Sequence, residues 1–370
     1  YYPAGSSENY RYFYLDRVIL DSSRNEFTTG DEYQVTYRGP LVQMFAVQDA
    51  SWEHARKLDI GLDLTLFRNW NLVFDYFYEK RYDILMRRAS WPNSLGYKDA
   101  VPWSNIGKVD NWGYEFSTSY TKNFGKDWTL DFRGNVSYNE NKYVFKDEIW
   151  HEYPYQVETG RPLSTMYGYV AEGLFTSEEE IASHAKQDLG SDPMVGDIKY
   201  RDLNGDGLIN TYDQTFISEY GTMPRIQYGF GLNLRWKKFD FGVFFNGSAM
   251  RKIMLSGIQP FGQNDHNVFQ FIADDHWSEA NPNPNAKYPR LAVDETLDQN
   301  NRVNSTYWMR NGNFLRFKQL EIGYTFKYGR IYLTGDNLAV FSPFKEWDPE
   351  LSWNDYPLQR TFNIGIQLNL

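Results

Sequence analysis

Apolar and polar residues alternate with a period of two along much of the chain, a pattern that predicts β-strands with one apolar and one polar face. In residues 361–370, apolar side chains take every second position from Phe362, and polar residues or glycine lie between them. A weaker candidate lies between Tyr10 and Ala46. Nine segments are clear: 58–66, 72–78, 112–120, 128–138, 226–236, 239–245, 320–326, 331–333 and 361–370. We therefore predict an all-β protein of about ten strands.

Short and long connections alternate between these segments. The short ones are turns of hairpin length at 68–69, 123–127, 237–238 and 327–329, and aromatic residues flank them. The long ones cover about 86–108, 143–224, 251–313 and 339–357. Short turns on one side, long loops on the other and aromatic rings near the turns are typical of a transmembrane antiparallel β-barrel of the outer membrane. We expect short periplasmic turns and long extracellular loops.

A soluble β-sandwich or propeller is the alternative, because its strands also alternate. In such a protein, polar faces such as Gln227, Asn233 and Arg235 would be solvated, whereas a barrel places them in a wet lumen. The soluble alternative explains poorly why all the long loops fall on one side. The barrel is therefore favoured.

Composition agrees with this interpretation. The chain has 370 residues, of which 12 are Trp, 29 Tyr and 26 Phe, yet its mean hydropathy is −0.64. Alternation explains how a chain so rich in aromatic residues can have a polar mean hydropathy, because the aromatics fall largely on one strand face and beside the turns. No run of about 18 apolar residues exists, as a membrane-spanning helix would require. The formal net charge of −10 argues against nucleic-acid binding, and the absence of cysteine excludes disulfides and thiol chemistry.

No catalytic motif is present. The sequence contains no nucleophile elbow, no zinc-protease helix motif and no phosphate-binding loop. Its five histidines lie outside the cores of the clear strands, and no two have zinc-helix spacing. We expect that the chain is not an enzyme.

Residues 202–213 read as a calcium-binding loop. The candidate ligands are Asp202, Asn204, Asp206, the carbonyl of Leu208, Asn210 and Asp213, at positions 1, 3, 5, 7, 9 and 12, with Gly207 at the sharp turn. Alternate oxygen ligands on a tight loop converge on one hard cation, and the predicted role of the calcium is structural. Position 12 is Asp instead of the Glu of an EF-hand. The alternative is an Asx-rich turn without metal. Nearby, Ser177 and Glu180 form a capping box that predicts a short helix within residues 176–187.

The region from Gly196 to Gly207, followed by Pro224 and Tyr228-Gly229-Phe230-Gly231, resembles SusC/RagA-type TonB-dependent transporters of the Bacteroidetes outer membrane. Further family-like segments occur in family order over roughly residues 50–370. They are Trp52-Glu53, Ile60 to Asp63, Asp75 to Phe77, Asp83 to Leu85, Asn105 to Glu115, Tyr167 to Phe175, Phe314 to Arg316, Asp336 to Leu338, Asp348 to Glu350 and Tyr356-Pro357.

The resemblance implies a large, 22-stranded plugged barrel, of which this chain holds about half the strands. We therefore expect residues 1–370 to be the C-terminal part of the barrel, with the plug domain and the TonB-contacting segment outside this chain segment. The last strand fits the assembly signal of outer-membrane barrels through Asn363, Gly365, Leu368 and Leu370. Many family members end in Phe, whereas this chain ends in Leu370.

The resemblance also implies TonB-dependent import of oligosaccharides, or other large nutrients, with a SusD-like surface lipoprotein as lid. RagA-like oligopeptide import is the alternative within the family. A calcium-stabilised soluble carbohydrate-binding protein and a passive porin are alternatives of other classes. The loop aromatics Trp150, Trp347, Trp353 and Tyr356 are candidates for stacking on cargo, or else anchors that pack the loops. The expected partners are the lipoprotein, TonB, outer-membrane lipid and the cargo, with no nucleic acid.

Overall fold

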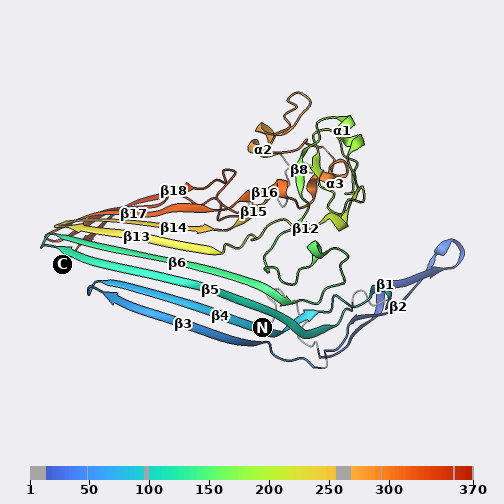
Figure 1. The fold of residues 1–370 in the computed structure, drawn as a ribbon, viewed down its shortest axis with the longest axis horizontal. Coiled ribbons are helices and arrows are strands. Elements are labelled where there is room, and N and C mark those ends of the chain that lie inside the picture. Colours follow the sequence, from blue (N-terminus) through green and yellow to red (C-terminus); the bar gives the residue numbers. More distant parts are fainter. Residues whose placement is uncertain are drawn as a thin grey trace. The chain divides into compact units, whose positions relative to one another are not determined.

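The computed structural model describes residues 14–47, 49–95, 100–255, 268–292, 294–352 and 355–368. Its main element is one nine-stranded antiparallel sheet (Figure 1). The strands are β3 (His54–Leu66), β4 (Trp70–Arg87), β5 (Trp103–Phe124), β6 (Trp128–Phe145), β13 (Ile226–Trp236), β14 (Phe239–Ala249), β17 (Phe314–Phe326), β18 (Gly329–Phe341) and β19 (Thr361–Leu368). The described residues of all nine alternating segments lie in this sheet, so the all-β prediction is confirmed.

The strand order is β19-β18-β17-β14-β13-β6-β5-β4-β3, so neighbours in sequence are neighbours in the sheet. Short turns join β3 to β4, β5 to β6, β13 to β14 and β17 to β18. Because every pair is antiparallel, the short turns share one end of the strands and the long connections share the other. The first long connection is shorter than predicted, 88–102 instead of 86–108, because backbone pairing continues past the alternating residues: Arg88 N–H donates to Pro102 O at 2.9 Å.

One face of the sheet is apolar and open to the surroundings. On the last strand, Phe362, Ile364, Ile366 and Leu368 are all exposed. Nearer the short turns, the rings of Trp128 and Trp236 stack with centroids 5.4 Å apart, and Phe239 and Tyr324 continue this row with centroids 4.9 Å apart. Exposed apolar strand faces edged by aromatic rings are what a lipid-facing surface requires.

Strand β17 contains a β-bulge at Lys318. Its pairing with β14 runs from Gln319 opposite Phe244 to Phe317 opposite Phe245, so Lys318 has no opposite residue. The bulge brings Arg316 and Gln319 to the same face, although they are three positions apart and would face opposite sides in a regular strand.

The chain divides into two compact units, which are described separately. The first comprises residues 1–58, 77–112 and 141–163 and includes a β-hairpin of β1 (Arg17–Thr29) and β2 (Val35–Met44). This hairpin falls within the weaker strand candidate predicted between Tyr10 and Ala46, of which residues 10–13 lie outside the described residues. The second unit comprises 59–76, 113–140 and 164–370.

In the second unit, three long connections pack into one folded region, here called the loop body (residues 164–225, 250–255, 268–292, 294–313 and 342–352). It contains short strands and helices: β7 (Tyr167–Gly168), β8 (Ala171–Leu174), α1 (Glu178–Ser183), β9 (Lys186–Gln187), β10 (Ile198–Tyr200), β11 (Leu208–Ile209), β12 (Thr215–Phe216), β15 (Lys252–Met254), α2 (Gln270–Asp274), α3 (Gln299–Arg302) and β16 (Met309–Asn311). Helix α1 confirms the predicted short helix and its N-cap, since Glu180 N–H donates to Ser177 Oγ at 3.2 Å. The predicted box is half formed, because the Glu180 carboxylate accepts from Thr176 N–H at 2.8 Å.

Single 3-10 turns complete the described secondary structure. They cover Asp31–Tyr33, Asn93–Leu95, Pro154–Gln156, Thr211–Asp213, Glu295–Leu297 and Thr306–Trp308. No helix among the described residues is long and apolar enough to cross a membrane.

The loop body has its own hydrophobic core. Large side chains that are fully buried, such as Tyr200, Leu255, Ile272 and Trp308, come from different connections and pack in one cluster. A buried polar network joins the connections. Asn301 accepts the Ile198 N–H at 2.8 Å and donates to Asp197 at 2.7 Å. Because these bonds link residues about 100 positions apart, the long connections form a folded body instead of separate loops.

Candidate functional site

The second face of the sheet is polar, and it forms the candidate functional surface. Strand alternation places Asp131, Arg133 and Asn135 of β6 beside Gln227, Asn233 and Arg235 of β13. On β14 the same face carries Asp240, Phe244, Asn246 and Ser248, and on β17 it carries Arg316, Gln319 and Glu321. Among the hollows of this surface in the described part of the chain, two differ clearly in charge.

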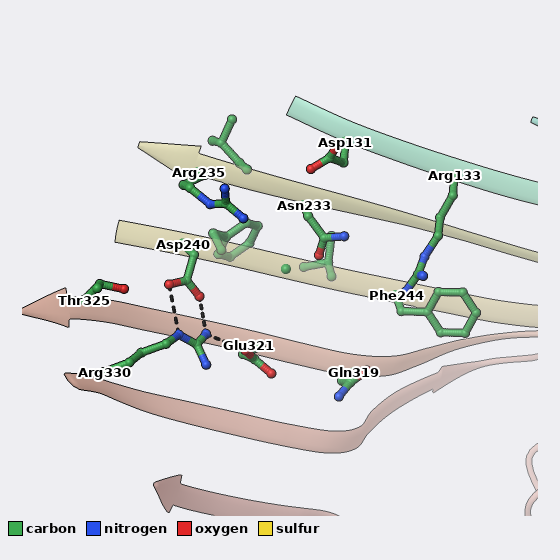
Figure 2. A pocket seen from close by; sticks show the side chains of 14 residues that line it. Asp131, Arg133, Asn233, Arg235, Asp240, Phe244, Gln319, Glu321, Thr325 and Arg330 are labelled. Carbon is green, nitrogen blue, oxygen red and sulfur yellow. Dashed lines mark hydrogen bonds and ion pairs between the residues drawn. The ribbon is translucent and has the colours of Figure 1, made fainter. Parts of the chain in front are cut away.

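The charged hollow lies toward the short turns and has a volume of about 560 Å³ (Figure 2). Arg330 forms ion pairs with both Asp240 and Glu321, and its Nε lies 3.1 Å from Asp240 Oδ1. This cluster of three charged side chains has room because residue 323 is glycine. A Cβ at that position would come within 2.4 Å of an Asp240 oxygen. Among the described residues, Arg133 and Arg235 form no ion pair, and Asp131 accepts a hydrogen bond from Thr121 Oγ1 at 2.7 Å, so this hollow carries unpaired charges of both signs.

The neutral hollow lies on the same face toward the long connections and has a volume of about 610 Å³. Three amide side chains, Asn135, Gln227 and Asn246, line it together with Ser248. Charged groups at its border are engaged elsewhere. Arg251 donates to Thr222 O at 2.9 Å and to Pro349 O at 2.6 Å, and Glu350 is paired with Arg316.

Phe244 lines both hollows, although it lies on the polar face. Its ring covers two glycines: a Cβ on Gly229 or Gly231 would lie 3.2 Å or 3.1 Å from the ring. One side of the ring therefore packs on bare backbone, and the ring forms an apolar patch between polar side chains.

A buried guanidinium fixes the long-connection end of the sheet. Arg316 is fully buried, and its Nη2 and Nε lie 2.6 Å from Asp348 and Glu350, respectively, while Asn337 accepts a third bond. Three separate family-like segments of the sequence thus meet here. The motifs themselves were the available signal, but a resemblance of separate segments does not predict that they meet in one cluster.

The predicted calcium loop folds around its own backbone N–H groups. Asp202 accepts from Gly205 at 2.7 Å and from Gly207 at 2.8 Å. Asp213 is buried and accepts from Leu203 at 2.8 Å and from Asn210 at 2.9 Å.

The remaining candidate ligands join the same local network. Asp206 accepts from Leu208 N–H, Asn204 from Asp206 N–H, and Asn210 from Tyr212 N–H. The described residues contain no group of three or more acidic or histidine side chains arranged to hold a metal ion. The geometry agrees with the Asx-turn alternative as well as with a calcium loop, so calcium stays a prediction.

The predicted cargo-stacking aromatics lie in different surroundings. Trp150 is 84% exposed and Tyr356 is 77% exposed. Trp347 packs edge-on against Phe344 and its indole donates to Leu351 O at 3.1 Å, a contact that suits a packing anchor. Trp353 lies outside the described residues. Their role in binding stays a prediction.

The predicted assembly signal lies on the sheet edge. Asn363, Gly365 and Leu368 pair with Thr334, Tyr332 and Gly329 of β18, whereas Leu370 lies outside the described residues. Gly365 is required by close packing, because a Cβ there would lie 2.3 Å from the Tyr332 ring.

Known proteins are similar to this chain in sequence and in fold. The TonB-dependent receptor P3 of Formosa agariphila is 30% identical over 369 residues, an alignment that covers 89% of this chain and 35% of the receptor. The TonB-dependent receptor SusC of Bacteroides thetaiotaomicron is 23% identical over 389 residues, covering 96% of this chain and 35% of SusC. No protein-family model matches the chain. The chain thus spans about a third of the length of the curated relatives that it matches.

The fold is also similar to that of a known outer-membrane importer. The RagAB peptide importer in its open-open state superposes with a TM-score of 0.65 at 20% identity, covering 97% of this chain and 38% of the importer chain. The sheet is therefore part of a TonB-dependent outer-membrane β-barrel, and the chain lies in the bacterial outer membrane. Within that class it is of the SusC/RagA type, as the sequence motifs predict. These relatives are receptors and transporters, which agrees with the expectation that the chain is not an enzyme.

Proposed function

We propose that this chain is the C-terminal part of the barrel of a transporter that imports a large nutrient across the outer membrane, driven by TonB and lidded by a SusD-like lipoprotein. The observation that carries the proposal is the polar, hollowed face of the nine-stranded sheet in a chain that matches SusC and RagA over nearly its whole length. A lumen surface of this kind offers hydrogen-bonding groups to polar cargo. No chemical step is assigned to the chain, because energy for transport would come through TonB.

Oligosaccharide is the proposed cargo. Oligopeptide is the second candidate, since the superposed RagAB is a peptide importer. In either case the loop body belongs to the surface that meets the lipoprotein. Trp347 of the loop body and Trp150, Trp353 and Tyr356 of the other long-connection segments are proposed to contact cargo. A structural calcium ion held by the 202–213 loop is part of the proposal, because bound metal would brace a segment whose carboxylates are already placed by backbone bonds.

Uptake by whole cells tests the proposal. Cells that express the complete transporter with its SusD-like partner should take up labelled neutral oligosaccharides, and loss of TonB or of the partner should abolish uptake. Uptake of labelled oligopeptides instead would favour the second candidate. Uptake that continues without TonB would identify a passive porin and contradict the proposal. A protein that remains soluble without detergent after fractionation would contradict it as well.

A further inference from the structure

The neutral hollow contains buried polar atoms that have no partner. Ser248 is 5% exposed, yet its Oγ forms no hydrogen bond within the described structure. Asn246 Oδ1, two residues earlier on the same strand face, is also buried and unpartnered. Buried polar atoms normally find partners, and leaving two of them without one in the same cavity is costly. Both residues line the cavity, so these atoms lie at its wall, where a rotation of either side chain would present them to a ligand.

The other groups around the cavity define the chemistry of that ligand. Asn135, Gln227 and Asn246 each carry a donor and an acceptor, as the hydroxyl groups of a sugar also do. The charges at the border balance, because Arg251 and Arg316 both lie in the field of the Asp348 and Glu350 carboxylates, and Arg251 also donates to two backbone carbonyls. A charged ligand would find no free counterion here. The neighbouring charged hollow, where Arg133 and Arg235 form no ion pair, provides the opposite environment.

Phe244 adds the apolar component. Its ring rests on Gly229 and Gly231 and borders the cavity beside the amide groups. The apolar face of a pyranose ring packs on such an aromatic surface while its hydroxyl groups reach the polar side chains. The combination suits an uncharged, hydroxyl-rich ligand better than a peptide with charged ends.

We infer that the neutral hollow is a binding subsite for an uncharged sugar unit of the cargo, with Asn246 and Ser248 as its hydrogen-bonding residues and Phe244 as its stacking platform. The inference rests on the proposed transport function and assigns its substrate class to particular residues.

Two near-isosteric variants of the complete transporter, Ser248→Ala and Asn246→Leu, test the inference. Each removes an atom that has no partner in the free protein, so the thermal unfolding midpoint should stay unchanged or rise. Each also removes a ligand hydrogen bond, so affinity for neutral oligosaccharides should fall about tenfold. The probes are neutral α-glucan, β-glucan, mannan and fructan oligosaccharides, measured by calorimetry on the detergent-purified complex with its lipoprotein partner. Val243→Ala, on the opposite, apolar face of the same strand, is the control and should leave affinity unchanged.

The outcomes are distinct. Weaker sugar binding with undiminished stability in both variants supports the inference. Unchanged sugar affinity overturns it, and so does a loss of affinity that accompanies a lower unfolding midpoint, which indicates a structural role. If the wild-type complex binds oligopeptides and no neutral sugar, the sugar subsite is wrong while TonB-dependent import stands. If the complex shows TonB-independent uptake, the proposed function fails whatever the variants do.

Discussion

The nine-stranded sheet and the loop body are built on opposite principles. The sheet leaves its apolar side chains exposed, as Ile364 at 76% and Ile366 at 64% show, and its own order comes from the backbone ladder between antiparallel neighbours. The loop body has little regular secondary structure but buries Tyr200, Trp308 and their neighbours completely. A lipid environment completes the first region, whereas the second has the buried core of a soluble domain.

The contrast predicts in which region single substitutions should lower the stability of the protein. Outward-facing strand residues contact solvent or lipid and tolerate apolar exchange. Loop-body residues belong to dense cores and buried polar networks, where one lost partner is costly. Substitutions in the two regions test this difference.

Arg316→Met should have the largest effect, because the guanidinium is buried and neutralises Asp348 and Glu350. Removing one member of a buried ion pair costs about 3–5 kcal/mol. The connection at 342–352 should become sensitive to protease in the purified transporter. Arg201→Met is the matched control: its pair with Glu172 is exposed, so its effect should stay below about 1 kcal/mol. Equal sensitivity of the two variants would contradict the assignment.

Asn301→Leu should loosen the loop body without disturbing the sheet. The change removes the side-chain bonds to Ile198 N–H and Asp197, which leaves a buried donor and a carboxylate with fewer partners. The expected loss is about 2–3 kcal/mol. Hydrogen exchange should accelerate in β8 and β10 while β13 and β14 stay protected. Faster exchange in the sheet as well would show that the two regions unfold together.

Replacing Asp202 and Asp206 by Ala should remove bound calcium and loosen residues 190–220. The backbone N–H groups of Gly205, Gly207 and Leu208 also lose their acceptors, so the loop should open even without metal. Metal analysis of the purified protein separates the two effects, with Glu178→Ala as an exposed control. Unchanged calcium content in the double variant would contradict the predicted site.

Acid should weaken the α1 region. The bond from Lys199 and the backbone N–H of Thr176 lower the pKa of Glu180 to about 2, from an ordinary value of 4.5. Since the folded-state pKa is depressed, the stabilisation is complete above about pH 4.5 and is lost as the pH falls through about 2. Protection of α1 amides against exchange should decline over this interval. Glu180→Gln should abolish the pH dependence, whereas Glu178→Gln should retain it.

The same contrast separates what the sequence predicts from what it does not. Strand alternation is local, so the residues of 226–236 reveal their two faces, and the polar face at Gln227, Asn233 and Arg235 was predicted correctly. The loop body depends on partners far apart in the chain. Nothing near Asp197 indicates that Arg290 will pair with it at 2.6 Å.

The neutral hollow escaped prediction for a related reason. Phe244 interrupts the alternation of 239–245, and that signal was present in the sequence. Its meaning depends on the neighbouring strand, where Gly229 and Gly231 leave space for the ring. Likewise, Asn246 and Ser248 look like ordinary polar strand residues until burial shows that their oxygens lack partners.

The bulge at Lys318 determines which side chains of strand β17 lie on the polar face of the sheet. Arg316 and Gln319 share the polar face only because one unpaired residue lies between them. Deleting Lys318 would remove the bulge and leave Arg316 and Gln319 two positions apart on the same polar face. If Lys318 were instead paired in a regular ladder, either Arg316 or Gln319 would point toward lipid. A gain or loss of one residue elsewhere in β17 would likewise invert the faces of its side chains, so length changes in this family should accumulate in the long connections.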